Sequence, residues 1–318
     1  MSAPNPRYRT EILPYGKAAI AEAARLIGQG LPVAMPTETV YGLAADATNG
    51  EAVARIYEAK GRPGFNPLIV HVSGLAEAEQ HGFFPEAALM AARHYWPGAL
   101  TIVVPRREDS PVASLATAGL ASIALRCPNH QAMQDLLAAV GRPLAAPSAN
   151  ASGGISPTNV DHVLKTLEAR IPLVIDGGHT AQGVESTIVS FLDGKLALLR
   201  PGPIDIAQLA AVTGLPIGER SARIEAPGQM RSHYAPEKTL RLDAIQREPH
   251  EWMIGFGPCD GDDNLSPGGD VIEAASRLFD ALHRADDSDK PAIAVAPIPK
   301  TGIGAAINDR LSRAAAPR

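Results

Sequence analysis

The sequence predicts an α/β or α+β protein of two domains, on three observations. Its 318 residues fit about two domains, and 45% of them are hydrophobic, which is enough to bury a sizeable core. Apolar residues recur at helical spacing in some segments and form short continuous runs in others. Because these two kinds of segment alternate irregularly along the chain, we expect a mixed sheet covered by helices.

In the first 218 residues this pattern predicts short strands separated by helices. Residues 17–28 are one such helix, since their apolar side chains share a face that ends at Gly28 or Gly30. The other expected helices are 52–60, 85–95, 130–140, 159–167 and 206–212. The expected strands are 31–35, 68–72, 100–104, 122–126, 144–146, 173–176, 187–191 and 195–199.

Two local signals refine this pattern. Asp193-Gly194 lies between the last two expected strands and predicts a hairpin, because this dipeptide favours tight turns. Thr158 directly precedes the helix expected at 159–167 and is its predicted N-cap.

The chain is predicted to divide into three parts. The first domain spans residues 1–218. Residues 219–238 lack clear periodicity and are interrupted by prolines, so we expect an interdomain linker there. A smaller α/β domain follows over 239–318. Its expected strands are 252–256 and 292–296, its expected helices are 271–283 and 305–315, and 260–269 is expected to be a loop.

Composition excludes several classes of protein. A net charge of −5 and a pI of about 6.0 argue against a protein that mainly binds nucleic-acid phosphates, although a local basic cleft is compatible with both. Cys127 and Cys259 show no paired spacing, so neither a disulfide framework nor a zinc site is indicated. Residues 1–15 lack a signal core, and no apolar run approaches the ~20 residues of a membrane span. We expect a cytoplasmic protein.

Lys60 and Arg62 are the first candidate site residues. A helix is expected to end at these residues, and a buried strand follows that ends at His71. Cations are favourable at a helix C-terminus, where unpaired carbonyls concentrate negative charge. Two fixed cations beside a strand end suit a polyanion such as a nucleoside triphosphate. Alternatively, the two side chains only cap the helix.

Further polar groups follow other expected strands. The segment PSANASG (147–153) offers hydroxyls, an amide and backbone N–H groups that can approach a phosphate. Arg126 and Arg200 each end a strand, and a planar guanidinium suits phosphate or carboxylate. An ordinary serine–glycine loop and a surface salt bridge are the alternatives. The sequence contains no GxxxxGK[ST] phosphate loop, no GxSxG elbow and no metal-ligand spacing of histidines.

Taken in order, these segments resemble the YrdC-domain family, the threonylcarbamoyl-AMP synthases. The resemblance covers roughly residues 12–215, and the ordered set is far more specific than any one piece. Residues 226–236 and the chain after them resemble the linker and extra domain of the family's long form. The matching segments are PTETVYGL (36–43), KGRP with NPLIVHV (60–63, 66–72), WPGALT (96–101), PSANASG (147–153), SPT (156–158), GVESTIV (183–189) and LRPG (199–202).

The resemblance implies a twisted open α/β sheet with a positively charged concave face, followed by a smaller Rossmann-like α/β domain. It implies a nucleotidyltransferase that makes threonylcarbamoyl-AMP and pyrophosphate from L-threonine, bicarbonate and ATP. Mg²⁺ would accompany the ATP, with no metal site built by the protein. A separate transferase would then move the threonylcarbamoyl group to an adenosine of certain tRNAs. Neither stable nucleic-acid binding nor membrane contact is expected.

The resemblance also assigns roles to individual residues. Lys60 and Arg62 are expected to be catalytic, by neutralising phosphate charge. Tyr234, on the linker, is expected to cover the nucleotide as a lid. The residues expected to bind ATP are Lys60, Arg62, Asn66, Ser122, Ser148, Ser156, Arg200 and Tyr234. Those expected to bind L-threonine are Thr39, His71, Arg126, Ala146 and Ser186.

Two other functions are weighed against this one. The first is a carbamoyl-adenylate-forming enzyme, like the related domain of hydrogenase maturation proteins. That context brings zinc-finger and acylphosphatase segments, which this sequence does not contain. The second is an RNA-binding module, against which the acidic net charge counts.

Overall fold

The computed structural model describes residues 8–218 and 233–317, so most of the expected linker lies outside the described residues. Within this part of the chain, no helix has the length and apolar character needed to cross a membrane.

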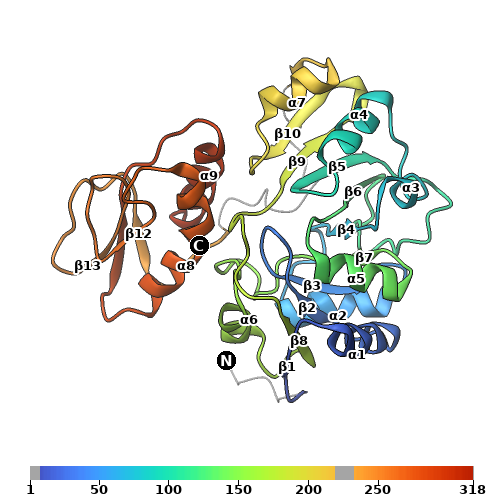
Figure 1. Ribbon diagram of the computed structural model, residues 1–318, viewed down its shortest axis with the longest axis horizontal. Coiled ribbons are helices and arrows are strands. Elements are labelled where there is room, and N and C mark those ends of the chain that lie inside the picture. Colours follow the sequence, from blue (N-terminus) through green and yellow to red (C-terminus); the bar gives the residue numbers. More distant parts are fainter. Residues whose placement is uncertain (1–7, 219–232, 318) are drawn as a thin grey trace.

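A large twisted sheet forms the first domain (Figure 1). Its strands are β1 (Glu11–Pro14), β2 (Val33–Met35), β3 (Gly42–Asp46), β4 (Ile69–His71), β5 (Leu100–Pro105), β6 (Ser122–Arg126), β7 (Leu144–Ala145), β8 (Leu173–Asp176), β9 (Thr187–Ser190), β10 (Leu196–Arg200) and β11 (Ile217–Gly218). Among the described residues the strand order is β1-β8-β2-β3-β7-β4-β6-β5-β9-β10-β11. Parallel and antiparallel pairs are mixed along this order, which confirms the predicted mixed α/β architecture.

Different helices cover the two faces of this sheet. The helices are α1 (Lys17–Gly28), α2 (Gly50–Lys60), α3 (Leu75–Ala78), α4 (Glu86–Tyr95), α5 (Gln131–Val140), α6 (Val160–Leu167) and α7 (Ile206–Thr213). On β2, Val33 and Met35 join a core with α1 and α5, while Ala34 joins the core that contains α2, α4 and α6. This alternation is the two-residue period of a strand buried on both faces.

Most of the expected elements are confirmed, and three expectations need correction. The N-cap of α6 is Asn159 and not Thr158, because the Asn159 side chain accepts a hydrogen bond of 2.9 Å from the His162 amide. Thr158 instead contacts the His162 ring. The hairpin of β9 and β10 is confirmed, but its turn is a short 3₁₀ segment, Leu192–Gly194. The loop expected at 260–269 contains β14 (Asp263–Asn264).

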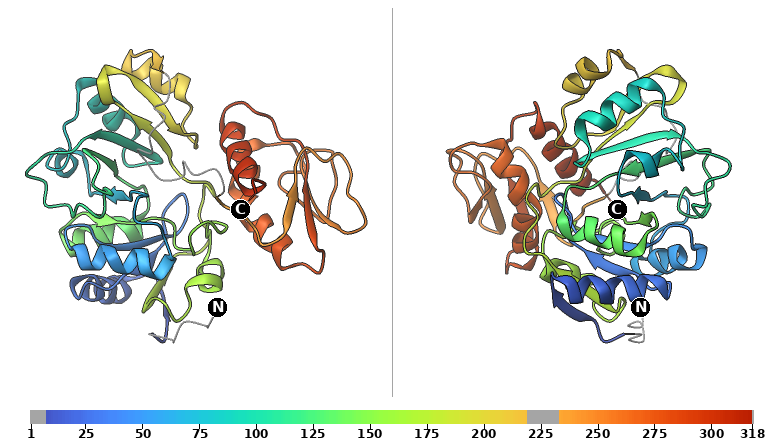
Figure 2. Two further views of the ribbon diagram at one scale, coloured as in Figure 1. Left: turned by 180° about the vertical axis from the view of Figure 1, so that it is seen from behind. Right: turned by 45° about the vertical axis from the view of Figure 1, so that its right-hand side comes forward.

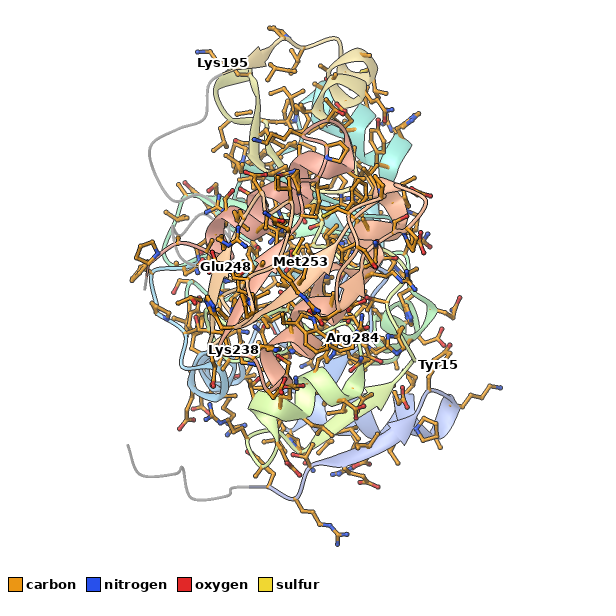
Figure 3. The ribbon with its side chains drawn as sticks, turned by 90° about the vertical axis from the view of Figure 1, so that its left-hand side faces the viewer. Tyr15, Lys195, Lys238, Glu248, Met253 and Arg284 are labelled. Atoms are coloured by element: carbon orange, nitrogen blue, oxygen red, sulfur yellow. The ribbon has the colours of Figure 1, made fainter. Side chains whose placement is uncertain are left out.

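The C-terminal domain is a smaller parallel sheet with two helices (Figure 2). Besides β14, its strands are β12 (Thr239–Arg241), β13 (Glu251–Gly255) and β15 (Ala292–Val295), and its helices are α8 (Val271–Asp287) and α9 (Ile303–Ala314). The described strands pair in the order β12-β15-β13-β14. Figure 3 looks onto this domain, with Met253 of β13 near its centre. Helices α8 and α9 lie on the side that faces the first domain.

The two domains share a hydrophobic core. Val40, Ile155 and Val184 of the first domain belong to the same buried cluster as Leu278 and Phe279 of α8. Removing this much apolar surface from water favours a fixed arrangement of the domains. The predicted domain boundaries stay a prediction, but β11 pairs with β10 and so ends the large sheet at Gly218.

Polar contacts surround this shared core. The rings of His162 on α6 and His283 on α8 stack with their centroids 3.8 Å apart. His283 Nε2 lies 3.3 Å from the Ser156 carbonyl, and His162 Nε2 lies 3.4 Å from an Asp280 carboxylate oxygen. Lys165 pairs with Asp287 at the same interface.

At Gly183 the backbone of the first domain closely approaches the backbone of α8. Its φ is +67°, and a Cβ placed there would lie 2.4 Å from the Ser276 carbonyl oxygen and 2.5 Å from the Ser276 Cα. These are backbone atoms that cannot turn away, so a side chain at position 183 must push the two domains apart. The glycine therefore permits this contact.

We expect Gly183→Ala to lower the free energy of unfolding by about 1–3 kcal/mol, from the overlap and the positive φ together. Denaturant unfolding measures this change. Gly28→Ala is the control, because a Cβ there meets nothing within 4 Å. Equal stability of the two variants would contradict the close approach.

The stacked histidines predict a dependence of stability on pH. Burial lowers the pKa of His162 to about 4 and that of His283 to about 2. Below about pH 6.5 the unfolded imidazoles take up protons that the folded interface excludes, so stability is lost as the pH falls from 6.5 toward 4. Between pH 7 and pH 5, the unfolding temperature should fall less in a His162→Gln, His283→Gln double variant than in the parental protein. The same fall in both proteins would refute this assignment.

Candidate functional site

A pocket opens in the first domain between the loop after β2, the ends of β4 and β6, and the loop after β7. It encloses about 540 Å³ of space, with open solvent at its mouth included. The residues that line it are Thr37, Thr39, Val40, Gly42, Arg62, Ile69, His71, Arg126, Ala146, Pro147, Ser148, Glu185, Arg200, His233 and Tyr234.

One corner of the pocket is set by the register of two parallel strands. His71 of β4 is paired with Arg126 of β6, and both residues end their strands. Arg126 Nη1 donates to Thr39 Oγ1 at 3.0 Å, and Arg126 Nε donates to the Gly98 carbonyl at 3.2 Å. The register therefore brings together a cation, a hydroxyl and an imidazole at one point.

The loop after β2 is held by its own threonine. Thr37 Oγ1 donates to the Val40 carbonyl at 2.6 Å and lies 3.0 Å from Thr39 Oγ1. Between these threonines, Glu38 forms a buried ion pair with Arg126 at 2.8 Å. Burial raises the pKa of Glu38, but Arg126 and backbone amides, that of Asn129 among them, together hold this pKa below its usual value. Arg126 thus has a permanent carboxylate partner behind the pocket.

His71 is neutral in this site. Burial and the nearby Arg126 lower its pKa to about 3. Its Nδ1 atom has no hydrogen-bond partner among the described residues, and the side chain is only 2% exposed. An uncharged, unpaired ring nitrogen in a pocket is available to a ligand.

Arg62 forms part of a second wall. Its Nη2 donates to the Pro67 carbonyl at 2.8 Å and its Nε to the Asn66 carbonyl at 3.2 Å. Burial lowers its pKa to about 10, which still leaves the guanidinium charged at neutral pH. Two backbone carbonyls orient Arg62 without neutralising it.

Arg200 is held in the same way. Its Nε donates to the Ser186 carbonyl and its Nη2 to Ser186 Oγ, both at 3.1 Å. Ser186 Oγ in turn lies 2.8 Å from Thr101 Oγ1 on β5. Burial lowers the pKa of Arg200 from its usual value. Ser186 is therefore a support for Arg200 and is not among the lining residues.

Lys60 lies behind the pocket. The residue is 3% exposed, and its ammonium donates to the Ser148 carbonyl at 2.5 Å, to the Asn150 carbonyl and to Asn150 Oδ1 at 3.4 Å. Burial and Arg62 lower its pKa well below its usual value. Three acceptors match the three donors of an ammonium group, so Lys60 braces the loop after β7.

Glu185 is the only carboxylate in the pocket lining within the part of the chain that the structure describes. Its Oε1 accepts from Ser156 Oγ at 2.5 Å, and its Oε2 accepts from Arg310 Nε of α9 at 2.8 Å. Although burial raises the pKa of Glu185, Arg310 and Arg200 outweigh this effect and hold it low. With three arginines and one carboxylate, the lining favours an anionic ligand.

His233 and Tyr234 close the pocket from the side of the C-terminal domain. Their rings meet edge to face at 4.1 Å, and the Tyr234 ring lies 5.7 Å from Phe279 of α8. Tyr234 is 1% exposed and adopts a φ of +63°. Its hydroxyl has no hydrogen-bond partner within residues 8–218 and 233–317.

The structure brings eight of the predicted site residues into the pocket lining and leaves five outside it. Among the five, Lys60, Ser156 and Ser186 contact residues of the lining, as described above. Asn66 offers its carbonyl to Arg62. Ser122 begins β6, at the opposite end from Arg126. The eight are Thr39, Arg62, His71, Arg126, Ala146, Ser148, Arg200 and Tyr234. The roles of all thirteen stay predictions.

Sequence reasoning missed several residues of this site. Glu38, Glu185 and His233 lie inside the segments that carry the family resemblance, at 36–43, 183–189 and 226–236, so these positions could have been included in the predicted site. Thr37 could have been found from the spacing of two threonines in a short loop. Arg310 gave no signal, because an arginine on an amphipathic helix normally faces solvent.

Two family models match this chain, one over most of the first domain and one over the C-terminal part. The Sua5/YciO/YrdC family model, described as "Telomere recombination", matches residues 25–202. The model described as "Threonylcarbamoyl-AMP synthase, C-terminal domain" matches residues 204–316. The fold is thus that of a two-domain protein of the Sua5 type. The chain belongs to the Sua5/YciO/YrdC family, in its long form.

Relatives of known name extend over nearly the whole chain. A threonylcarbamoyl-AMP synthase of Bacillus subtilis is 39% identical over 335 residues, covering 97% of this chain and 96% of the relative. One of Pyrococcus abyssi is 38% identical and covers 92% of each chain. The structure of P. abyssi Sua5 complexed with L-threonine has a TM-score of 0.87 at 36% identity, covering 96% of this chain and 97% of that one.

We expect Lys60→Met to lower the free energy of unfolding by roughly 1–3 kcal/mol or more, because buried carbonyls lose their donor. Thermal or denaturant unfolding measures this loss. Lys17→Met is the matched control, since Lys17 is exposed at the start of α1. If the two variants were equally stable, Lys60 would not brace the loop.

Proposed function

We propose that this pocket binds L-threonine and ATP side by side and makes threonylcarbamoyl-AMP and pyrophosphate, with bicarbonate as the third substrate. The observation that carries the proposal is the convergence of two kinds of wall on one pocket. Thr39, His71 and Arg126 form a corner suited to a small amino acid. Arg62, Ser148 and Arg200 form a cationic wall suited to a triphosphate.

In the amino-acid corner, Arg126 would bind the threonine carboxylate. Glu38 compensates part of its charge and fixes its direction, so the carboxylate meets an oriented donor. Thr39 and the free Nδ1 of His71 would bind the polar groups of threonine. Ala146 contributes a small side chain to the same lining, and Ser186 would act by holding Arg200.

On the other wall, Arg62 and Arg200 would neutralise phosphate charge, while Lys60 holds the Ser148 loop from behind. Asn66, Ser122 and Ser156 complete the residues proposed to bind ATP. Tyr234 would cover the nucleotide. Mg²⁺ would arrive with the triphosphate as part of the substrate.

The proposed chemistry needs no covalent enzyme intermediate. The threonine amine and bicarbonate give a carbamate with loss of water. A carbamate oxygen then attacks the α-phosphorus, and the bond from phosphorus to the pyrophosphate oxygen breaks. The arginines stabilise charge on the phosphates, and the pocket holds the two reactants together. Because carbamates lose CO₂ readily in water, cover by His233 and Tyr234 would protect the intermediate.

The product would serve a separate transferase that modifies an adenosine of certain tRNAs, and the enzyme would work in the cytoplasm. The net charge of −5 supports an enzyme that does not itself hold tRNA tightly. Turnover without RNA separates this enzyme from an RNA-binding module. Tight tRNA binding with no consumption of ATP would favour the module.

We expect Arg62→Ala to lower threonine-dependent release of pyrophosphate from ATP by at least about a hundredfold, because a charge-stabilising donor is lost. A pyrophosphate assay with and without L-threonine measures this activity. Arg93→Ala is the control, since Arg93 is an exposed arginine of α4. Near-normal turnover of the Arg62 variant would refute its role.

A further inference from the structure

Arg310 of α9 crosses from the C-terminal domain into the wall of the pocket. It is completely buried, which is rare for an arginine. Its Nε donates to Glu185 Oε2 at 2.8 Å and its Nη1 to the Pro201 carbonyl at 2.8 Å. Asp309, its neighbour on α9, accepts a further bond of 2.9 Å from Nη1. Two residues of the first domain, Glu185 and Pro201, thus hold one cation of the second.

The partner that Arg310 compensates is the carboxylate of the pocket lining. Glu185 lies in the same lining as Arg62 and Arg200, which we propose bind the triphosphate. An unpaired carboxylate at this position would repel phosphate oxygens and would also cost free energy by being buried. Ser156 satisfies one oxygen of Glu185, and among the residues that the structure describes Arg310 is the cation outside the lining that forms an ion pair with it.

Arg310 also contacts the aromatic cover of the pocket. Its guanidinium carbon lies 5.3 Å from the centroid of the Tyr234 ring, a distance typical of a cation–π contact. The Tyr234 ring also lies 5.7 Å from the ring of Phe279 of α8. A single side chain therefore fixes both an acidic wall residue and the tyrosine above it.

We infer that Arg310 is a positioning residue of the nucleotide side of the pocket, through which the C-terminal domain controls binding of ATP. It neutralises Glu185 and orients Tyr234, and it does not touch the threonine corner at Arg126. This inference rests on the proposed function. It gives the C-terminal domain a defined part in the reaction.

The test is Arg310→Met, which keeps an apolar stem and removes the charge. We expect the KM for ATP in threonine-dependent pyrophosphate release to rise at least roughly tenfold, as for other broken buried charge pairs. The KM for L-threonine should change much less. Arg313→Met is the matched control, because Arg313 pairs with the same Asp309 and lies outside the lining.

Removing the charge of Glu185 distinguishes neutralisation by Arg310 from a role of Arg310 in stability alone. In an Arg310→Met, Glu185→Gln double variant, the buried carboxylate is gone, so most of the lost affinity for ATP should return. An unchanged KM for ATP in Arg310→Met overturns the inference. So does an equal loss in the double variant.

A second pair of variants and a direct measurement of ATP binding cover the case in which Arg310→Met does not fold. If Arg310→Met does not fold, Arg310→Gln, which also removes the charge but keeps hydrogen-bonding groups, is compared with Arg313→Gln, and the first should again weaken ATP binding selectively. Calorimetric binding of a non-hydrolysable ATP analogue is measured for every variant. If the parental protein bound the analogue but showed no threonine-dependent turnover, the proposed function would fail. The effect of Arg310 on analogue binding would still decide the inference.

Discussion

The carboxylate of Glu185 is held by groups from both domains, and the arrangement of the pocket depends on it. Ser156 reaches it from the segment before α6, and Arg310 reaches it from α9. A buried carboxylate is stable only when its oxygens are satisfied, so these groups must stay together. The shared apolar core of Val184 with α8 provides the favourable burial that holds the two domains at this distance.

The other charges in the site follow a different rule. Arg62 and Arg200 are oriented mainly by backbone carbonyls, which fix their direction without cancelling their charge. Most of the positive charge therefore remains available to a ligand in a buried setting, where electrostatic interactions are strong. Arg126 differs, because Glu38 pairs with it from behind. The cationic wall thus carries more uncompensated charge than the amino-acid corner does.

Features that depend on neighbouring residues could be predicted from the sequence, whereas contacts between distant parts of the chain could not. Helix α1 and strand β6 have the expected bounds, because periodicity and end signals are local. The meeting of His71 and Arg126 required the parallel pairing of β4 with β6, which no local pattern specifies. Lys60 was expected beside a ligand, yet its partners are carbonyls of a loop ninety residues away. Such partners depend on tertiary structure and leave no pattern in the sequence.

The distance along the chain between Glu185 and Arg310 has a consequence during synthesis. The two residues are 125 positions apart, so the ribosome completes the whole first domain long before the counter-charge of Glu185 exists. A nascent chain without α8 and α9 lacks this counter-charge and leaves the apolar surface of Val40, Ile155 and Val184 uncovered. Exposed apolar surface makes a partly made protein prone to aggregation, and the pocket is complete only when the C-terminal domain has been made.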